Sequence, residues 1–297
     1  MGLAFSDAKM FWEAKQAGAA FESTLTIGHQ KLLLHPPEVK YFQKIVDSQK
    51  DLSCRVLRDY QFGDYSDDFL REFLGVTSLS ILDNSPYEGA NLIHDLNEPV
   101  PENLWNRFDA VIDAGSLEHV FNFPVAISSL MHMVKVGGKA FITTPANNLC
   151  GHGFYQFSPE LMFRIFSEQN GFRLDRIELL PARFPKVELA PMRVGYAVTD
   201  PAIVGERVEI VSKNPIMMTI EATKTQDSVA LSSSPPQQSD YEAVWAQGGE
   251  LTPAPYKAKL KAIVRRLPHF LHMRIKGYYH RSRCSFSNSA FYRRRRF

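Results

Sequence analysis

The stretch FDAVIDAGSLEHVFNFPVAISSLMHMVKVGGKAFITTPANN, residues 108–148, contains a complete strand–helix–strand unit. It begins with a β-rich apolar run, Phe108–Ile112, which ends in polar residues. Apolar residues then recur with the i, i+3, i+4, i+7 spacing of an amphipathic helix, at Ile127, Leu130, Met131 and Val134. The pair Gly137-Gly138 ends that helix, and the apolar run KAFITTP follows it. A strand, a crossover helix and a second strand are typical of a parallel sheet.

The same alternation continues on both sides of this unit. Apolar runs of strand length occur at Ser23–Ile27, Val76–Leu82 and Asn91–His94, and later in FRLDRIELL and PIMMTIEAT. Helical patterns stand between them, at Asp7–Lys15, from Pro36 onward, at Ser66–Leu74 and from Ser158 to Gly171. The sequence therefore predicts an α/β fold with a mostly parallel sheet that helices cover on both faces.

Composition excludes several classes of protein. The 297 residues are 44% hydrophobic and 22% charged, which is ordinary for a globular chain. Three cysteines, Cys54, Cys150 and Cys284, are odd in number and far apart, which argues against a disulfide framework or a zinc cluster. No segment approaches the roughly 18 consecutive apolar residues of a membrane span, and the N-terminus lacks a signal pattern. We therefore expect a cytoplasmic protein.

Charge is distributed unevenly along the chain. Residues 255–297 contain 13 Lys and Arg and no Asp or Glu, whereas residues 1–254 carry the other 21 basic and all 32 acidic residues, a net charge of −11. Between them, the Ser/Pro/Gln-rich segment 224–254 has the composition of a linker. We predict three parts: a folded domain at 1–223, a flexible linker at 224–254 and a basic amphipathic tail at 255–297, with a helix broken at Pro268.

The basic tail allows three interpretations. It could lie on an anionic membrane surface, bind nucleic acid through phosphates, or dock on the acidic body of the protein or on a partner. The apolar residues of the tail favour a membrane surface or a protein partner over nucleic acid, and they are Leu260, Ile263, Leu267, Phe270, Leu271 and Ile275. A peripheral position at the inner membrane is therefore expected alongside the cytoplasmic one.

Ligands of an open parallel α/β sheet bind beyond the carboxyl ends of the strands. The residues directly after the expected strands are therefore the candidates for chemistry, and they are Gly28-His29-Gln30, Asp83-Asn84-Ser85, Asp95-Leu96-Asn97, Asp113–His119 and Thr144–Asn147. Asp83 is the most interpretable, because a carboxylate after the second strand can accept hydrogen bonds from both ribose hydroxyls of a nucleoside. An aspartate that only begins the turn DNSPYEG is the equally weighted alternative.

Residues 108–148 resemble the central half of class I S-adenosylmethionine-dependent methyltransferases. The shared features are a strand that ends in an acid or serine, a Leu-Glu-His-Val run, a helix, a basic residue with Gly-Gly, and a strand with a Thr-Pro turn. LDNSPYEGANLIHDLN is similar to the second and third strands of the same family. The resemblance spans residues 21–223 and is strongest over 79–172. It implies a Rossmann-like, doubly wound, mostly parallel seven-stranded sheet and an S-adenosylmethionine cofactor.

Carried over by position, the resemblance implies a set of cofactor contacts. Asp83 and Asn84 would hold the ribose, and Asp95 and Leu96 would border the adenine. Asp113, Gly115 and Ser116 would lie beside the methionine part, and Glu118 and His119 would line the mouth of the site. His119 could instead only cap or pack the helix that follows it.

The first motif departs from the family in STLTIGHQKLLL, residues 23–34. The family carries an acid and two or more glycines here, whereas this chain has Thr26 in place of the acid and Gln30 in place of the second glycine. Gly28 matches the first glycine. His29 or Gln30 would then have to supply polar contacts to the cofactor, unless Gln30 points away. The insertion of about 50 residues before the next strand exceeds one crossover helix and is expected to hold two helices.

The loop GHGFYQF follows the fifth strand and would face the acceptor. His152 or His119 could act as a general base near neutral pH, and Tyr155 could orient the acceptor. The alternative is a loop whose aromatic residues pack under a helix. No paired histidines stand at metal spacing on a helix, and no phosphate-binding loop or Gly-x-Ser-x-Gly motif is present. We therefore predict no metal site.

The sequence thus favours an S-adenosylmethionine-dependent methyltransferase acting on a small-molecule or glycan acceptor, with transfer to oxygen preferred over nitrogen. The loop is also similar to methyltransferase-like proteins of bacterial surface-polysaccharide clusters. Because the first motif is incomplete, a methyltransferase-fold scaffold or binding protein without turnover in such a pathway is the second hypothesis. A nucleic-acid methyltransferase recruited by the tail is the third.

Overall fold

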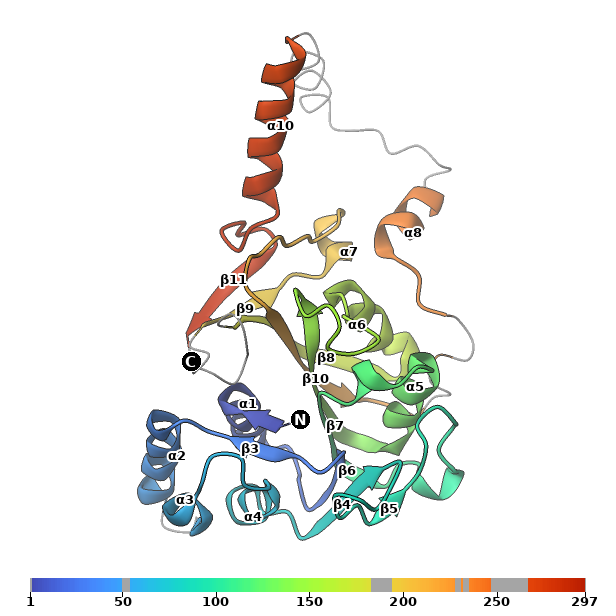
Figure 1. Ribbon diagram of the computed structural model, residues 1–297. Helices are drawn as coiled ribbons and strands as arrows, with labels where there is room; N and C mark the ends of the chain where they lie inside the picture. The colour runs from blue at the N-terminus through green and yellow to red at the C-terminus, as the bar shows by residue number, and fades with distance from the viewer. Residues whose placement is uncertain are drawn as a thin grey trace.

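A nine-stranded sheet forms the centre of the computed structural model (Figure 1). The structure describes residues 2–49, 54–182, 194–227, 231, 235–246 and 267–296, and within them the strand order is β11-β9-β8-β10-β7-β6-β2-β4-β5. The strands are β2 (Ser23–Ile27), β4 (Ser78–Asp83), β5 (Leu92–Ile93), β6 (Phe108–Ala114), β7 (Val134–Asn147), β8 (Phe172–Pro181), β9 (Val194–Val198), β10 (Ile216–Lys224) and β11 (Tyr292–Arg296).

Strand direction shows a doubly wound sheet. The neighbours β5, β4, β2, β6 and β7 are parallel, while β10 runs antiparallel between β7 and β8. From β2 the chain builds outward to β4 and β5, and then returns to the other side of β2 to build β6 and β7. The predicted Rossmann-like α/β fold is therefore confirmed. The sheet has two more strands than predicted, because β9 and β11 extend the edge beyond β8 by antiparallel pairing.

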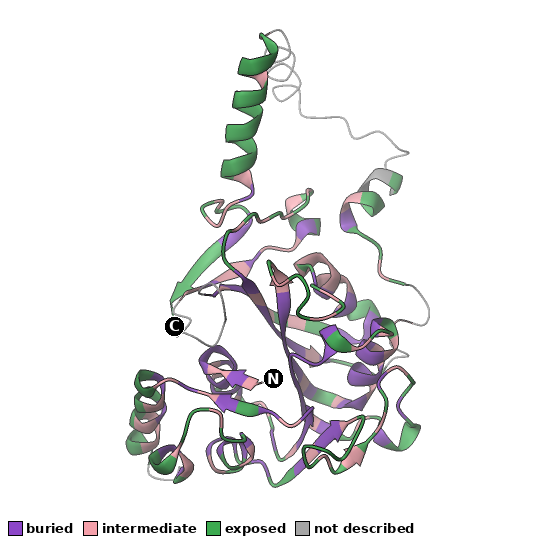
Figure 2. Cartoon of the chain, viewed as in Figure 1, coloured by how far each residue is buried: buried purple, intermediate pink, exposed green. Residues whose placement is uncertain are grey.

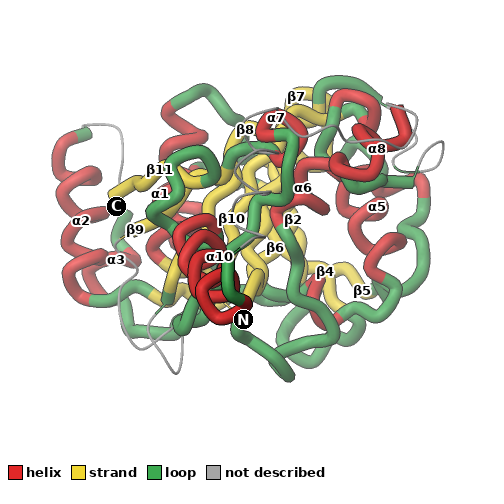
Figure 3. Tube along the Cα trace, turned by 90° about the horizontal axis from the view of Figure 1, so that it is seen from above, coloured by secondary structure: helices red, strands yellow, loops and turns green. Residues whose placement is uncertain are grey.

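Helices cover both faces of the sheet, as the view from above shows (Figure 3). The α-helices are α1 (Phe5–Gln16), α2 (Pro36–Ser48), α3 (Val56–Asp59), α4 (Asp67–Phe69), α5 (Phe123–Met133), α6 (Pro159–Ile165), α7 (Pro201–Val204), α8 (Ser239–Ala246) and α10 (His269–Arg283). A π-helical turn, Leu70–Leu74, continues α4, and single 3-10 turns lie at Glu102–Leu104, Leu117–His119 and Glu168–Asn170.

Two hydrophobic cores lie on opposite faces of the sheet, and the central strands appear largely buried between the helices, whereas β11 is mostly exposed (Figure 2). Alternation along β7 separates them, because Ala140 and Ile142 belong to the core with α5 and α6, whereas Phe141 belongs to the core with α1 and α2. Successive side chains of a strand point to opposite faces. A strand whose residues are all apolar therefore contributes alternate side chains to the two cores.

The insertion after β2 holds one short helix, α3, and one strand pairing beyond the two helices that were predicted. Helices α2 and α3 lie in it, followed by α4 with its π-helical turn. In addition, β3 (Lys31–Leu33) pairs in parallel with β1 (Gly2–Ala4) to form a separate two-stranded sheet. This pairing fastens the N-terminus beside the loop that follows β2.

The C-terminal segment divides into an exposed helix and a strand that joins the edge of the sheet. Helix α10 begins after Pro268, has no buried residue, and projects from the body of the molecule (Figure 1). By contrast, β11 pairs with β9, and Phe291 and Tyr292 are buried against the main core. Leu260, Ile263 and much of 224–254 lie outside the described residues, so the predicted domain boundaries stay predictions. Across the described part of the chain, no helix is both long and apolar enough to span a membrane.

Candidate active site

The order of the strands reverses between β2 and β6, and the carboxyl ends of these two strands form the switch point where ligands bind in doubly wound sheets. The carbonyl of Ile27 at the end of β2 accepts hydrogen bonds from Gln30 Nε2 at 2.5 Å and from Ser116 Oγ at 2.9 Å. Gly28 turns the chain with φ of +73° and donates its N–H to the carbonyl of Leu82 at 2.7 Å. A glycine suits this turn, because a side chain is strained at positive φ.

The loop after β2 is held by the protein itself. The His29 ring stacks on Tyr65 with centroids 3.6 Å apart, and its two nitrogens lie 2.6 Å from the Glu88 carbonyl and 2.9 Å from Asp67 Oδ1. Gln30 is 1% exposed and folds back on Ile27. Gln30 therefore points into the protein, and its role as a cofactor contact stays a prediction. Both nitrogens of His29 already have partners, so its role as a cofactor contact stays a prediction.

The two aspartates after β4 and β5 differ in their surroundings. Asp83 is half-buried, and its Oδ1 accepts a hydrogen bond from the N–H of the exposed Asn84 at 2.6 Å. Asp95 is exposed, and its Oδ1 accepts from the backbone and side-chain nitrogens of Asn97, which lower its pKa. Leu96 is buried in the main core. Among the described residues, the other carboxylate oxygen of Asp83 has no hydrogen bond and is available for a ligand, while Asp95 also closes its own turn.

Asp113 is the next-to-last residue of β6 and is fully buried. Its Oδ1 accepts from the backbone N–H of Ser116 at 2.9 Å, across a turn in which Gly115 has φ of +96°. Its Oδ2 is buried and has no hydrogen-bond partner among the described residues. Burial, and then the nearby carboxylate of Glu118, raise the pKa of Asp113 well above its ordinary value.

Glu118 lies on the 3-10 turn after β6 and is the most buried acid of the site, with an exposed fraction of 0%. Its Oε2 accepts a hydrogen bond from Thr144 Oγ1 of β7 at 3.2 Å. Its Oε1 has no hydrogen-bond partner within the described chain and lies 3.6 Å from Nε2 of His152. Burial raises the pKa of the Glu118 carboxyl to about 7.

Two histidines from different loops meet at Glu118. The rings of His119 and His152 have centroids 5.2 Å apart and are inclined by 51°. Burial, and then the neighbouring His152, lower the pKa of His119 below its ordinary value. The structure therefore brings together two of the predicted catalytic residues and adds the buried carboxylate between them.

The 149–157 loop is fastened to the turn that carries Glu118. The backbone N–H groups of Phe154 and Tyr155 both donate to the Glu118 carbonyl, at 2.8 and 3.2 Å. A side chain at Gly153 would place its Cβ 2.8 Å from that carbonyl oxygen. The absence of a side chain at Gly153 therefore allows two backbones to meet. This close approach is what sets His152 against Glu118.

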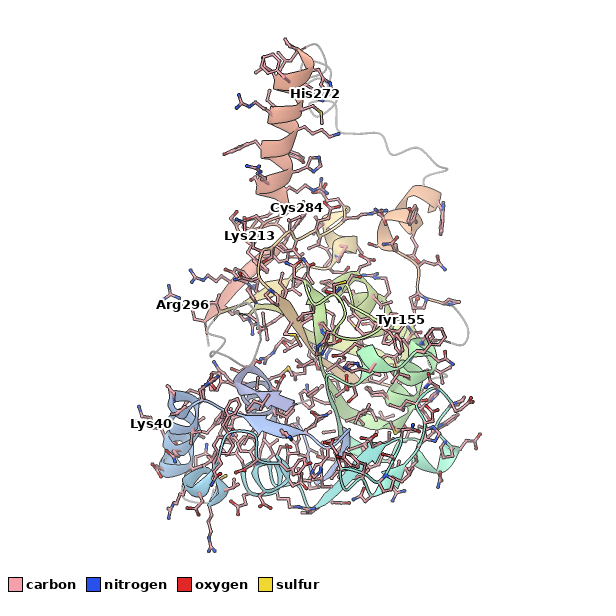
Figure 4. All side chains as sticks on the ribbon, viewed as in Figure 1. Lys40, Tyr155, Lys213, His272, Cys284 and Arg296 are labelled. Carbon is pink, nitrogen blue, oxygen red and sulfur yellow. The ribbon has the colours of Figure 1, made fainter. Side chains whose placement is uncertain are left out.

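Tyr155 lies on the other side of this loop. Its hydroxyl donates to the carbonyl of Phe121 at 2.6 Å, and its ring packs near Phe123 and Phe157. It borders a pocket of about 480 Å³ near α5 and α6, whose polar lining includes Gln156, Glu160 and Arg164. Tyr155 itself is labelled in Figure 4. The side chain therefore packs as the alternative interpretation of the loop expected, and its predicted role in orienting an acceptor stays a prediction.

Comparisons with known proteins give matches among solved structures alone. No family model matches the chain, and no curated protein matches it. A Bacillus halodurans protein provisionally assigned as a methyltransferase is 10% identical, covers 74% of this chain and 100% of its own, and has a TM-score of 0.40. The 1,6-didemethyltoxoflavin-N1-methyltransferase of Burkholderia thailandensis, solved with S-adenosylhomocysteine, is 11% identical, with 75% and 78% coverage and a TM-score of 0.38.

A branched-chain polyamine synthase of Thermus thermophilus, solved with 5′-methylthioadenosine, matches at 12% identity, with 75% of this chain and 60% of its own covered and a TM-score of 0.36. Two of these three proteins carry the name of the family that the sequence motifs resemble. At such identities and TM-scores, the similarities show nothing about the reaction or substrate of this chain. The Rossmann-like fold rests on the strand order and directions of the protein itself.

Proposed function

We propose that this protein is an S-adenosylmethionine-dependent methyltransferase that transfers a methyl group to an oxygen of a small-molecule or glycan acceptor. The observation that carries the proposal is the pair of buried carboxylates at the switch point, Asp113 and Glu118, each with an oxygen that lacks a hydrogen bond in the described structure. Native proteins leave few buried polar atoms unpaired, and such atoms in a ligand crevice are suited to a ligand with donors and positive charge.

The chemistry of the side chains fits the cofactor at both of its ends. The free oxygen of Asp83 can accept from the ribose hydroxyls, as acids after the second strand do in nucleotide-binding sheets. The raised pKa values of Asp113 and Glu118 fall when a cation binds beside them, so both carboxyls would ionise opposite the ammonium and sulfonium of the methionine end. When bound, the cofactor supplies a methyl group on a positively charged sulfur. Gly28, rather than His29 or Gln30, offers backbone that a ligand could approach closely.

We place the acceptor oxygen at the cluster of Glu118, His119 and His152. Methyl transfer depends mainly on alignment of donor, methyl group and nucleophile, together with a group that helps remove the proton from the acceptor. His152 has a half-exposed side chain on a loop, so an acceptor can reach it from solvent. His119 is also exposed and Glu118 is buried beside His152, and together they would fix the position of the acceptor oxygen.

Titration calorimetry with S-adenosylmethionine and S-adenosylhomocysteine tests the proposal. We expect binding by the wild-type protein, and Asp83→Ala should weaken it by about 10- to 100-fold, the effect of losing a hydrogen-bonded charge worth about 1.5–3 kcal/mol. Asp47→Ala is the matched control, since Asp47 is an exposed aspartate of α2. Absence of binding even at millimolar cofactor would overturn the proposal in favour of a scaffold or binding protein without turnover.

Helix α10 favours a second role, because it is a basic helix with several exposed apolar side chains. Phe270, Met273 and Tyr278 are 62%, 49% and 79% exposed, and no acidic residue occurs anywhere in 255–297. We propose that α10 holds the protein against an anionic membrane surface, where apolar side chains enter the headgroup region and basic ones contact lipid phosphates.

A further inference from the structure

We infer that Glu118, His119 and His152 form a binding site for a divalent first-row metal ion. Each residue offers one ligand atom, and the three ligand atoms all lie within 4.8 Å of one another. One carboxylate and two imidazoles are a ligand set that proteins use for zinc and for other first-row ions. Three protein ligands leave a coordination position for water or substrate.

The distance between Glu118 and His152 suits two ligands of one ion. Glu118 Oε1 and His152 Nε2 are 3.6 Å apart, which is longer than a charge-assisted hydrogen bond. Two ligands of a tetrahedral ion with bonds of about 2.1 Å lie roughly 3.4 Å apart. The two side chains are thus close to the separation that a shared ion would give them.

Burial adds an energetic reason for a cation at this place. Glu118 is fully buried, and its Oε1 has no hydrogen-bond partner in the part of the chain that the structure describes. An unpaired carboxylate oxygen in such a position is destabilising, and a bound cation offsets that cost. The side chain of His152, by contrast, is 45% exposed, so the cluster opens toward solvent on one side.

Neighbouring groups hold the three ligands in place. Thr144 Oγ1 donates to Glu118 Oε2 and leaves Oε1 directed at His152. The N–H groups of Phe154 and Tyr155 fasten the loop of His152 to the Glu118 carbonyl, and the absence of a side chain at Gly153 allows that contact. Hydrogen bonds of this kind orient the ligands of metal sites and support their affinity.

Metal binding at this site does not depend on the proposed function. Only the role of the bound ion in the reaction rests on the proposed function. At the acceptor position, a divalent ion would bind the acceptor hydroxyl and lower its pKa, so that its proton passes to water; the ion would then activate the acceptor in place of His119 and His152, whose ligand nitrogens are occupied. Glu118-His119 and His152 come from two loops, so the sequence shows no linear metal spacing here, and the titration below tests the prediction of no metal site.

Metal titration of the full-length protein, after treatment with a chelator, tests the site with Mn²⁺ and Zn²⁺ as probes. We expect one tight site. Calorimetry measures binding of both ions, and the electron paramagnetic resonance signal of Mn²⁺ reports its binding independently. His119→Ala and His152→Ala should each weaken it by at least about 10- to 100-fold, the usual range for losing support at a metal site. His272→Ala on α10 is the control and should bind as the wild type does (Figure 4).

Glu118→Gln should also abolish the site, but this buried position could affect folding. The two histidine variants therefore carry the test, with circular dichroism as a check on structure. No binding at millimolar Mn²⁺ or Zn²⁺, or binding that both histidine variants leave unchanged, would overturn the inference. Cofactor titration separates the two proposals. If His152→Ala binds S-adenosylmethionine but no longer binds metal, both proposals are supported. If the wild-type protein binds metal but not the cofactor, only the proposed function is contradicted.

Discussion

Asp7 shows how one buried acid links the N-terminus to the central sheet. It lies in the first turn of α1 and is 1% exposed. One carboxylate oxygen accepts from the Ala4 N–H at 2.7 Å, and the other accepts from Thr143 Oγ1 of β7. Burial raises the pKa of Asp7 to about 6, because desolvation outweighs both hydrogen bonds.

The raised pKa makes stability depend on pH in a defined direction. The folded pKa of Asp7 exceeds its unfolded value of about 3.9, so its protonated form stabilises the fold below that value, and this contribution is lost as pH rises through about 6. The loss amounts to about 3 kcal/mol for a shift of about two units. Asp7→Asn should remove it, because an amide can accept from Ala4 and donate to Thr143.

Chemical denaturation of wild type and Asp7→Asn between pH 4 and pH 7 measures this effect. The interval covers the unfolded and folded pKa values of Asp7, about 3.9 and about 6. We expect the difference in unfolding free energy between the two proteins to shift in favour of Asn as pH rises. Parallel pH profiles for the two proteins would show that Asp7 is not the group that titrates.

At the scale of elements, β11 and α10 behave as two different parts of one basic segment. Phe291, directly before β11, is 0% exposed in the main core, whereas Phe270 on α10 is 62% exposed. The five residues of β11 pair with all five of β9. The strand is therefore a component of the folded sheet, although its sequence, YRRRR, has the composition of a tail.

Two phenylalanine substitutions compare these elements directly. Phe291→Ala should lower the free energy of unfolding by about 3–5 kcal/mol, since it removes a buried aromatic ring and leaves a cavity. Phe270→Ala should change it by less than about 0.5 kcal/mol, because the ring is mostly in solvent. Thermal and urea unfolding give both values. Equal and small effects would mean that the C-terminal strand does not belong to the cooperative core.

At the scale of the whole molecule, positive charge is concentrated at one end of an otherwise acidic chain. Residues 1–254 carry a net charge of −11, and 255–297 carry 13 basic residues. Figure 4 shows His272 on the projecting α10, at the opposite end of the molecule from Lys40 on α2. This separation leaves a basic helix able to reach an anionic surface while the acidic body faces away from it.

Sedimentation with lipid vesicles tests this arrangement. The full-length protein should bind vesicles that contain phosphatidylserine at low salt, and should bind neutral phosphatidylcholine vesicles weakly. Arg274→Glu with Lys276→Glu and Arg281→Glu should reduce binding by at least about 100-fold, at roughly 1 kcal/mol for each basic residue lost and further repulsion from each acid. Lys40→Glu with Lys44→Glu is the control on α2. Stronger binding to nucleic acid than to anionic vesicles would favour the nucleic-acid alternative.

The sequence by itself determined the alternation of strands and helices, the doubly wound class and the positions of Asp83 and Asp113 at strand ends. These follow from local rules, because periodicity and turn residues act within a few positions of the chain. The expected helix at Ser66–Leu74 and the strand at Phe108–Ile112 were found close to those limits. The resemblance to methyltransferases added the expected roles of the strand-end residues.

Only the tertiary structure decided which side chains meet. His152 reaches Glu118 across 33 intervening residues through backbone hydrogen bonds, Gln30 turns inward to Ile27, and β11 pairs with β9 across a segment of more than 90 residues. Such contacts depend on side-chain direction and on whether the free energy gained by packing outweighs the entropy lost in closing long loops. Local periodicity in the sequence does not report either quantity. The buried carboxylate beside two imidazoles exists for that reason only in the folded protein.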